Sequence, residues 1–313
     1  MQNIKVSVII TTYKRPDDVV RAVKSCINQT LKEIEIIVVD DNSPDSEYRT
    51  LTEKGIQPLL KDDRIIYIKH DKNMNGSVAR NTGIRASKGE YISFLDDDDY
   101  YVPEKLETEY SVASALSDDY AGVLCNCYVE RNGVIVKAQQ TDSREQAVTA
   151  VLACNYSMGS GSNLFVRRDV VIEINGFDES LIRHQDLDFL VRVFLKYKLR
   201  KIEKPLFVVE LFSSHLNVPS LEKLVTTKKK LYSKYETLIK SLPQEDQSEI
   251  MGNNYLKLYE AAIANKKYRI AYGYYKKSTE YSFIDRRKKH RMAAVFLYSI
   301  VPNGIKKYIN RGR

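Results

Sequence analysis

The first hundred residues alternate between short apolar runs and longer amphipathic stretches. Four runs of strand length are mostly apolar, namely residues 5–10, 34–39, 65–68 and 90–95. A helix is predicted to open at Pro16, since proline suits the first turn and Val19, Val23 and Ile27 then share one face. Residues 76–86 predict another helix. Strands separated by helices at this spacing predict parallel βαβ units in a doubly wound, mostly parallel α/β sheet.

The pattern changes near residue 219. Before it, residues 121–138 predict a β-hairpin that turns at Asn132-Gly133, followed by a strand, two helices and a strand at residues 163–166, 169–174, 186–197 and 205–212. After Pro219, successive helices are predicted at residues 221–242, 248–265 and 268–281. We therefore expect an α/β domain over residues 1–219 and a helical appendage over residues 220–313.

The net charge differs between these two parts. The whole chain carries +8 and is 43% hydrophobic, which is ordinary for a globular protein. Residues 221–313 hold 21 Lys and Arg against 8 Asp and Glu, with 11 of the 22 tyrosines, so the rest of the chain is mildly acidic. A basic, tyrosine-rich segment suits an anionic partner.

No segment predicts export or a membrane span. The apolar run before Thr11 is too short for a signal peptide, and the longest late run, residues 293–301, is about half the ~18 residues that a span needs. The cysteines show neither zinc spacing nor a disulfide framework, which predicts reduced, mostly buried thiols in the cytoplasm at Cys26, Cys125, Cys127 and Cys154.

Polar residues gather where three predicted strands end: Thr-Thr-Tyr at residues 11–13, Asp-Asp at 40–41 and four aspartates at 96–99. Ligands of doubly wound sheets bind beyond the carboxyl ends of the strands. Four adjacent carboxylates repel one another, and Mg²⁺ or Mn²⁺ bound to phosphate oxygens would stabilise them. A solvated acidic turn is the alternative, but three segments that meet at one edge favour a binding site.

Five segments carry a resemblance: residues 6–13 (VSVIITTY), 36–43 (IIVVDDNS), 79–84 (ARNTGI), 89–99 (GEYISFLDDDD), and 176–179 (GFDE) with 184–186 (HQD). In this order they resemble the inverting family 2 glycosyltransferases of GT-A fold, of the bacterial cell-surface polysaccharide type. The resemblance covers about residues 4–215. It implies that residues 1–219 form a GT-A catalytic domain. The implied activity is that of a UDP-sugar-dependent hexosyltransferase in capsule, cell-wall or other surface glycan synthesis.

The resemblance assigns nucleotide-binding roles to residues at the strand ends. Thr11 and Tyr13 would line the nucleotide pocket, where a tyrosine ring can stack on a pyrimidine. Asp41 matches the residue that accepts the uracil N3–H, and Asp40 is either a second contact or a support for the loop. Either aspartate could instead cap the following turn. Arg80 matches a position that reaches the nucleotide, with a surface ion pair as the alternative.

The D-x-D signature of the family corresponds to residues 96–98. Asp98 is expected to ligate Mn²⁺ or Mg²⁺ on the diphosphate, while Asp96 and Asp97 act on the ribose or through water. Asp99 is expected to cap a helix near residue 103 or to brace the loop. His215 matches a place where some relatives bring a histidine to the metal or diphosphate.

The resemblance also identifies Asp186 as the catalytic base. It would deprotonate the acceptor hydroxyl, which attacks opposite the UDP, and a single displacement inverts the anomeric centre. Many relatives have Glu-Asp where this chain has Gln185-Asp186, so one carboxylate is missing. The alternative is that Asp186 only caps the following helix.

The appendage is expected to bind an anionic membrane rather than nucleic acid, because the family's acceptors are often lipid-linked saccharides. Its basic clusters lie at residues 228–230, 266–267, 286–289 and 306–307, and residues 291–300 could lie in the membrane interface. A solvated helical bundle or a homodimer contact are the alternatives. The protein is thus expected in the cytoplasm, peripheral at the inner face of the cell membrane.

Two other functions are alternatives to this assignment. A sugar-1-phosphate nucleotidyltransferase needs a glycine-rich phosphate loop after the first strand, and residues 11–16 contain no glycine. A non-catalytic partner subunit on the same scaffold would have no need of Asp98 and Asp186 together. Both features favour an active transferase that uses a UDP-sugar and a saccharide acceptor.

Overall fold

The computed structural model describes residues 4–211, 220–281, 294, 296–297 and 301. The chain forms two compact units, one of residues 1–147 and 157–216 and one of residues 148–156 and 217–313. Each unit is described by itself.

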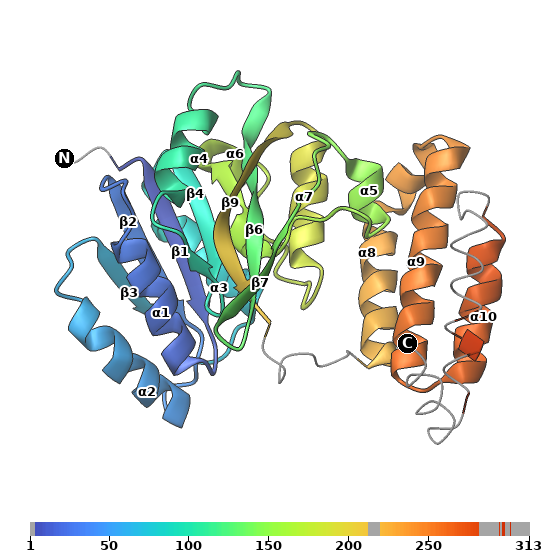
Figure 1. Ribbon diagram of the computed structural model, residues 1–313, viewed down its shortest axis with the longest axis horizontal. Helices are drawn as coiled ribbons and strands as arrows, with labels where there is room; N and C mark the ends of the chain where they lie inside the picture. Colours follow the sequence, from blue (N-terminus) through green and yellow to red (C-terminus); the bar gives the residue numbers. More distant parts are fainter. Residues whose placement is uncertain (1–3, 212–219, 282–293, 295, 298–300, 302–313) are drawn as a thin grey trace. The chain divides into compact units, whose positions relative to one another are not determined.

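One sheet organises the first unit, in the order β3-β2-β1-β4-β8-β6-β9-β5, with β7 on the side of β6 (Figure 1). Its parallel part consists of β1 (Val6–Thr12), β2 (Ile34–Asp40), β3 (Ile65–Lys69) and β4 (Tyr91–Asp96). The remaining strands are β5 (Tyr100–Tyr101), β6 (Tyr120–Arg131), β7 (Val134–Gln139), β8 (Phe165–Arg167) and β9 (Lys198–Glu210). Short β8 runs antiparallel to both β4 and β6 and so joins the parallel part to the parallel pair β6–β9.

Helices bury both faces of the parallel part, which is why its strands are almost continuously apolar. Ile36 and Val38 of β2 pack into the core with Val19 of α1 (Pro16–Ile27), whereas Ile37 packs with Ala79 of α3 (Gly76–Ala86) on the opposite face. The other helices of this unit are α2 (Glu47–Ile56), α4 (Lys105–Ala113), α6 (Arg168–Glu173) and α7 (Gln185–Phe194), with 3-10 turns η1 (Gln57–Leu59) and η2 (Gly161–Asn163).

The parallel register aligns the polar strand ends. Thr12 lies beside Asp40 across β1 and β2, and Thr11 lies beside Asp96 across β1 and β4. The predicted meeting of these segments at one edge is therefore confirmed.

The hydrophobic pattern predicted most elements within a few residues and missed some. The hairpin turns at Asn132-Gly133 as expected, since both residues have positive φ. β9 begins at residue 198 rather than 205, because its first half pairs with β6 although it is mostly charged and forms no apolar run. Helices α2 and α4 were not predicted, and both have weaker amphipathic patterns than α1.

The second unit contains α5 (Val148–Leu152), α8 (Leu221–Ser241), α9 (Gln244–Ala264) and α10 (Tyr268–Thr279). Its apolar core includes Leu256, Tyr259 and Ala271. No helix in the described part of the chain is both long and apolar enough to cross a bilayer.

One lysine of the expected basic surface is instead buried in this unit. Lys228 Nζ donates to Asn254 Oδ1 at 2.6 Å and lies 3.3 Å from Cys154 Sγ. The cluster at residues 228–230 therefore presents only its other two lysines to solvent. All four cysteines are free thiols, as predicted.

Candidate functional site

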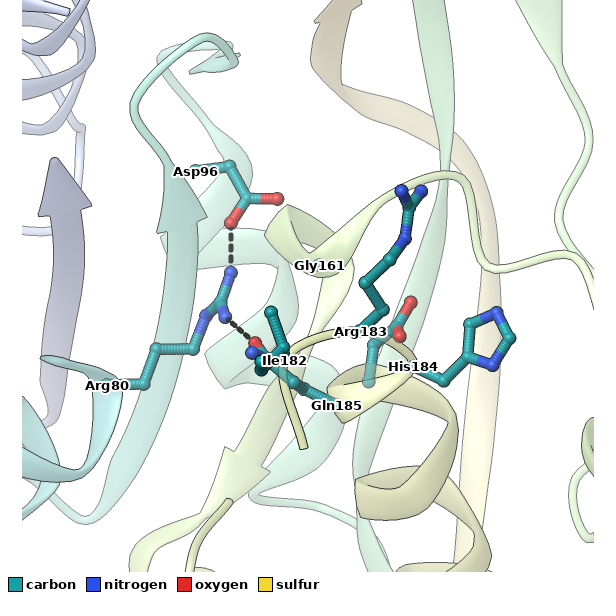
Figure 2. Close-up of a pocket in the computed structure, with 8 residues that line it drawn as sticks. Arg80, Asp96, Gly161, Ile182, Arg183, His184 and Gln185 are labelled. Atoms are coloured by element: carbon teal, nitrogen blue, oxygen red, sulfur yellow. Dashed lines mark hydrogen bonds and ion pairs between the residues drawn. The ribbon is translucent and has the colours of Figure 1, made fainter. Parts of the chain in front are cut away.

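Two adjoining cavities lie beyond the carboxyl ends of the parallel strands. The large cavity, of about 530 Å³, is lined by residues that include Thr11, Tyr13, Asp41, Asn75 and Asp98. The small cavity, of about 280 Å³, is lined by residues that include Gly161, Arg183, His184, Gln185 and Asp186 (Figure 2). Three residues, Arg80, Asp96 and Ile182, line both.

Asp41 organises the loop between β3 and α3. Its Oδ1 contacts His70 Nδ1 and accepts the Met74 N–H, both at 2.8 Å, and its Oδ2 accepts from Asn73 Nδ2 at 2.8 Å and the Asn75 N–H at 3.0 Å. Asn75 in turn caps α3 by accepting the N–H groups of its first turn. The carboxylate therefore holds the start of the helix that carries Arg80.

Asp40, for which the sequence predicts either a nucleotide contact or support of the loop, is buried among protein partners and lines neither cavity. Its side chain is 0% exposed, and it forms an ion pair with Arg49 Nε at 3.0 Å. Its oxygens also accept from the Tyr67 hydroxyl at 2.6 Å and from the backbone and side chain of Asn42. These contacts fit the other predicted role of Asp40, which is to support the loop after β2.

The aspartate run divides into carboxylates with different environments. Asp97 is buried, and it accepts from Arg15 Nη1 at 2.8 Å and from the Tyr13 backbone N–H at 3.3 Å. Burial raises the pKa of Asp97 to about 7, against the lowering effect of Arg15. Asp98 lies partly exposed in the large cavity and pairs with Arg15 at 2.6 Å. Arg15, which sequence analysis did not single out, thus offsets part of the repulsion within the run.

Asp99 braces a loop, one of the two roles expected for it. The hydroxyls of Ser160 and Ser162 both donate to its Oδ2 at 2.6 Å. Burial raises the pKa of Asp99 to about 8, and the charge of Asp96 acts in the same direction. These bonds place Gly161 against the small cavity, where an added Cβ would lie 3.1 Å from Asp96 Oδ2. A side chain at this position would press on that carboxylate, because the loop approaches it closely.

Arg80 connects the two cavities. Its Nη2 donates to Asp96 Oδ1 at 2.6 Å and its Nη1 donates to Gln185 Oε1 at 2.9 Å (Figure 2). The guanidinium also lies over the Phe177 ring, 5.3 Å from its centroid. The ion pair that was the alternative for Arg80 is therefore present, although the side chain lines both cavities. Gln185 supplies an acceptor to Arg80 without the charge of a glutamate.

Asp186 lies in the small cavity, in the first turn of α7, and this helix begins directly after the left-handed His184 (φ 61°). The side chain is half-buried. Burial raises the pKa of Asp186, against the lowering effects of the Leu187 backbone N–H and the charge of Arg80. The N-cap residue of α7 is His184, so Asp186 is the second helical residue and not the N-cap.

The accessible carboxylates suit a divalent cation only together with a substrate. Within the described ranges, no group of three or more His, Cys, Asp and Glu side chains could hold a metal ion. Asp96 and Asp98 both line the large cavity, and Mg²⁺ in nucleotide sites commonly binds one or two carboxylates plus substrate phosphates. The donor set thus fits a cation that arrives with a diphosphate. His215, the other predicted ligand, lies outside the described residues.

Comparison with known proteins decides the family. The profile described as Glycosyl transferase family 2 matches residues 7–174, more than half of the chain. The chain belongs to this family. As a family 2 glycosyltransferase, it is 27% identical over 234 residues to an uncharacterized glycosyltransferase, MJ1057, of Methanocaldococcus jannaschii, which covers 74% of this chain and 77% of that protein.

Two further similarities extend the comparison. The GalNAc(5)-diNAcBac-PP-undecaprenol beta-1,3-glucosyltransferase of Campylobacter jejuni is 39% identical over 137 residues, 42% of this chain and 41% of that enzyme. The crystal structure of S. aureus TarS 1-349 in complex with UDP-GlcNAc has a TM-score of 0.56 at 18% identity, covering 82% of this chain and 81% of that one. The predicted GT-A fold and the resemblance to family 2 glycosyltransferases are thereby confirmed.

Proposed function

We propose that this glycosyltransferase moves a sugar from a UDP-sugar to a hydroxyl of a saccharide acceptor with inversion, using Asp186 as the base. The observation that carries the proposal is the pair of cavities that share Arg80 and Asp96. The large cavity suits the donor and the small one suits the acceptor. The sugar to be transferred would then lie at their junction, with its anomeric carbon open to attack from the side of Asp186.

The large cavity offers suitable partners to a uridine diphosphate. The Tyr13 ring is 43% exposed at the mouth and is available for stacking on a base. Each oxygen of Asp41 already has two partners, so a uracil N3–H would replace the amide of Asn73, an exposed side chain that can rotate away. The complex of TarS with UDP-GlcNAc supports a uridine nucleotide as donor.

Asp98, with Asp96 beside it, would hold a Mn²⁺ or Mg²⁺ ion on the diphosphate. Such an ion supplies positive charge where the leaving UDP develops negative charge. Arg15, whose Nη1 pairs with Asp98 Oδ2 at 2.6 Å, would then exchange part of this contact for the phosphates.

Proton transfer is assigned to Asp186. A base is most effective when its pKa approaches the working pH, and burial moves the pKa of Asp186 upward in that direction. The bond from Arg80 to Gln185 fixes the first turn of α7 against Asp96, so the base keeps its place relative to the donor. The proton of the acceptor hydroxyl passes to Asp186 as the oxygen attacks the anomeric carbon and the bond to UDP breaks.

A panel assay tests the proposal. We expect UDP release from one or a few UDP-sugars in the presence of Mn²⁺ or Mg²⁺ and a saccharide acceptor, and its loss on addition of EDTA. Asp98→Asn should raise the metal concentration required for half-maximal rate, because one carboxylate ligand becomes a neutral amide. Full activity in EDTA would contradict the metal role, and no release from any UDP-sugar would contradict the donor.

For the acceptor, we propose a lipid-linked saccharide of a bacterial surface glycan, reached from the membrane surface. The name of the Campylobacter relative, which specifies an undecaprenol-diphosphate-linked glycan, supports this choice. The basic second unit supplies exposed lysines that would contact anionic headgroups.

Vesicle binding tests the membrane role. We expect the full chain to sediment with vesicles that contain anionic lipid and not with neutral ones. Replacing Lys229, Lys276 and Lys277 with glutamine should weaken this binding, since each lysine near the surface contributes about 1 kcal/mol. Buried Lys228 must be left intact, because its loss would disturb the helices. Equal sedimentation of the triple variant would contradict a role for these lysines.

A further inference from the structure

Arg183 is the cation of the site that the proposed mechanism does not use. The two other arginines at the cavities are engaged, Arg15 with the aspartate run and Arg80 with Asp96 and Gln185. Arg183 lines the small cavity and has no hydrogen-bond or ion-pair partner among the described residues. Figure 2 shows its guanidinium extended, with no dashed contact to the residues drawn.

The charges of the small cavity leave the positive charge of Arg183 without a neutralising partner. Arg80 and Asp96 neutralise each other, so the remaining charges are those of Arg183 and Asp186. Among the described residues, no hydrogen bond or ion pair joins Arg183 to Asp186. Its positive charge is therefore available to a bound molecule.

The local backbone places Arg183 beside the acceptor position. His184 adopts a left-handed conformation, which is unfavourable for a non-glycine residue and is found preferentially at functional sites. This turn lets Arg183, in the loop, and Asp186, in the helix, line the same small cavity. The preceding Ile182 is 80% exposed and lines both cavities, which gives the apolar face of a sugar ring a surface to pack on.

We propose that Arg183 binds an anionic group of the acceptor, a phosphate or a carboxylate carried close to the hydroxyl that reacts. A guanidinium donates two parallel hydrogen bonds to either group. Because the small cavity measures about 280 Å³, the anionic group and the reacting hydroxyl belong to the same or the adjoining sugar residue. Arg183 thereby offsets the repulsion between an anionic acceptor and Asp186 and selects charged acceptors over neutral ones.

The inference rests on the proposed function, and its test is a ratio of rates. Three acceptors that share one sugar would be compared: its alkyl diphosphate derivative, its uncharged alkyl glycoside, and the alkyl glycoside of the corresponding uronic acid. Each would be assayed with the full-length protein and the UDP-sugar found in the panel. For the wild type we expect one charged acceptor to exceed the neutral one in kcat/KM. Arg183→Gln should reduce that preference ~10- to 100-fold, the range for loss of a charge-assisted hydrogen bond. Arg183→Lys should restore part of it.

The two charged acceptors distinguish the two possible sources of the anionic group. A preference for the diphosphate assigns the anion to the lipid linkage, and a preference for the uronic acid assigns it to a saccharide carboxylate. The matched control is Arg131→Gln, which removes an exposed arginine from the β6–β7 hairpin and should leave the ratio unchanged. A wild-type preference that persists in Arg183→Gln, or no preference in the wild type, overturns the inference. Absence of transfer to every acceptor instead contradicts the proposed function.

Discussion

Asp186→Asn is expected to lower kcat by about 10²- to 10⁴-fold, the usual contribution of a general base. The amide is nearly isosteric with the carboxylate but cannot accept the proton of the attacking hydroxyl. Binding of the UDP-sugar should change little, since Asp186 lines only the small cavity. Turnover by UDP release and donor affinity by calorimetry measure the two effects separately.

The pH dependence of kcat/KM provides a second test of Asp186 as the base. Because burial raises the pKa of Asp186, the carboxylate is protonated and inactive at pH values where an ordinary aspartate remains ionised. We expect kcat/KM to decline as the pH falls through this raised pKa, at a higher pH than the 3.8 of an ordinary aspartate. Asp169→Asn, at an exposed carboxylate of the same unit, serves as the control and should leave turnover intact. Normal turnover by Asp186→Asn would remove Asp186 as the base.

Asp40→Ala is expected to lower the free energy of unfolding by about 3–5 kcal/mol, as when one partner of a buried ion pair is removed. The Arg49 side chain is only 7% exposed and would keep its charge without the carboxylate. The Tyr67 hydroxyl and the Asn42 amide would also lose an acceptor. Urea denaturation, with the slope compared between variants, measures the loss.

A surface ion pair provides the control for this variant. Asp62→Ala breaks a pair with Arg64 that is partly exposed to water, and such pairs contribute about 0–1 kcal/mol. If Asp40→Ala were as stable as Asp62→Ala and instead bound UDP-sugar more weakly, the structural role of Asp40 would be wrong and the nucleotide contact would be right.

The large elements were predictable because their hydrophobic periods are local properties of the chain. The helix at residues 76–86 was predicted with the bounds that α3 has, and the glycosyltransferase family followed from five short segments. The first half of β9, before residue 205, was missed, since it is stabilised by pairing with β6 and not by an apolar run of its own. Similarly, the hydrophobic pattern did not indicate that residues 148–156 belong to the second unit.

Within the site, the sequence alone determined which chemical groups stand at the strand ends, because a parallel sheet brings the carboxyl ends of neighbouring strands to one edge. Only the tertiary structure decided which of those groups are buried in structural contacts and which line the cavities. Asp40 and Asp41 are adjacent in sequence, yet the alternation of a strand end directs one at buried Arg49 and the other at the loop before α3. Likewise, only the tertiary structure identified Arg15 and Arg183 as site residues. Arg15 pairs with Asp98, which is far from it in the chain, and Arg183 lines the small cavity.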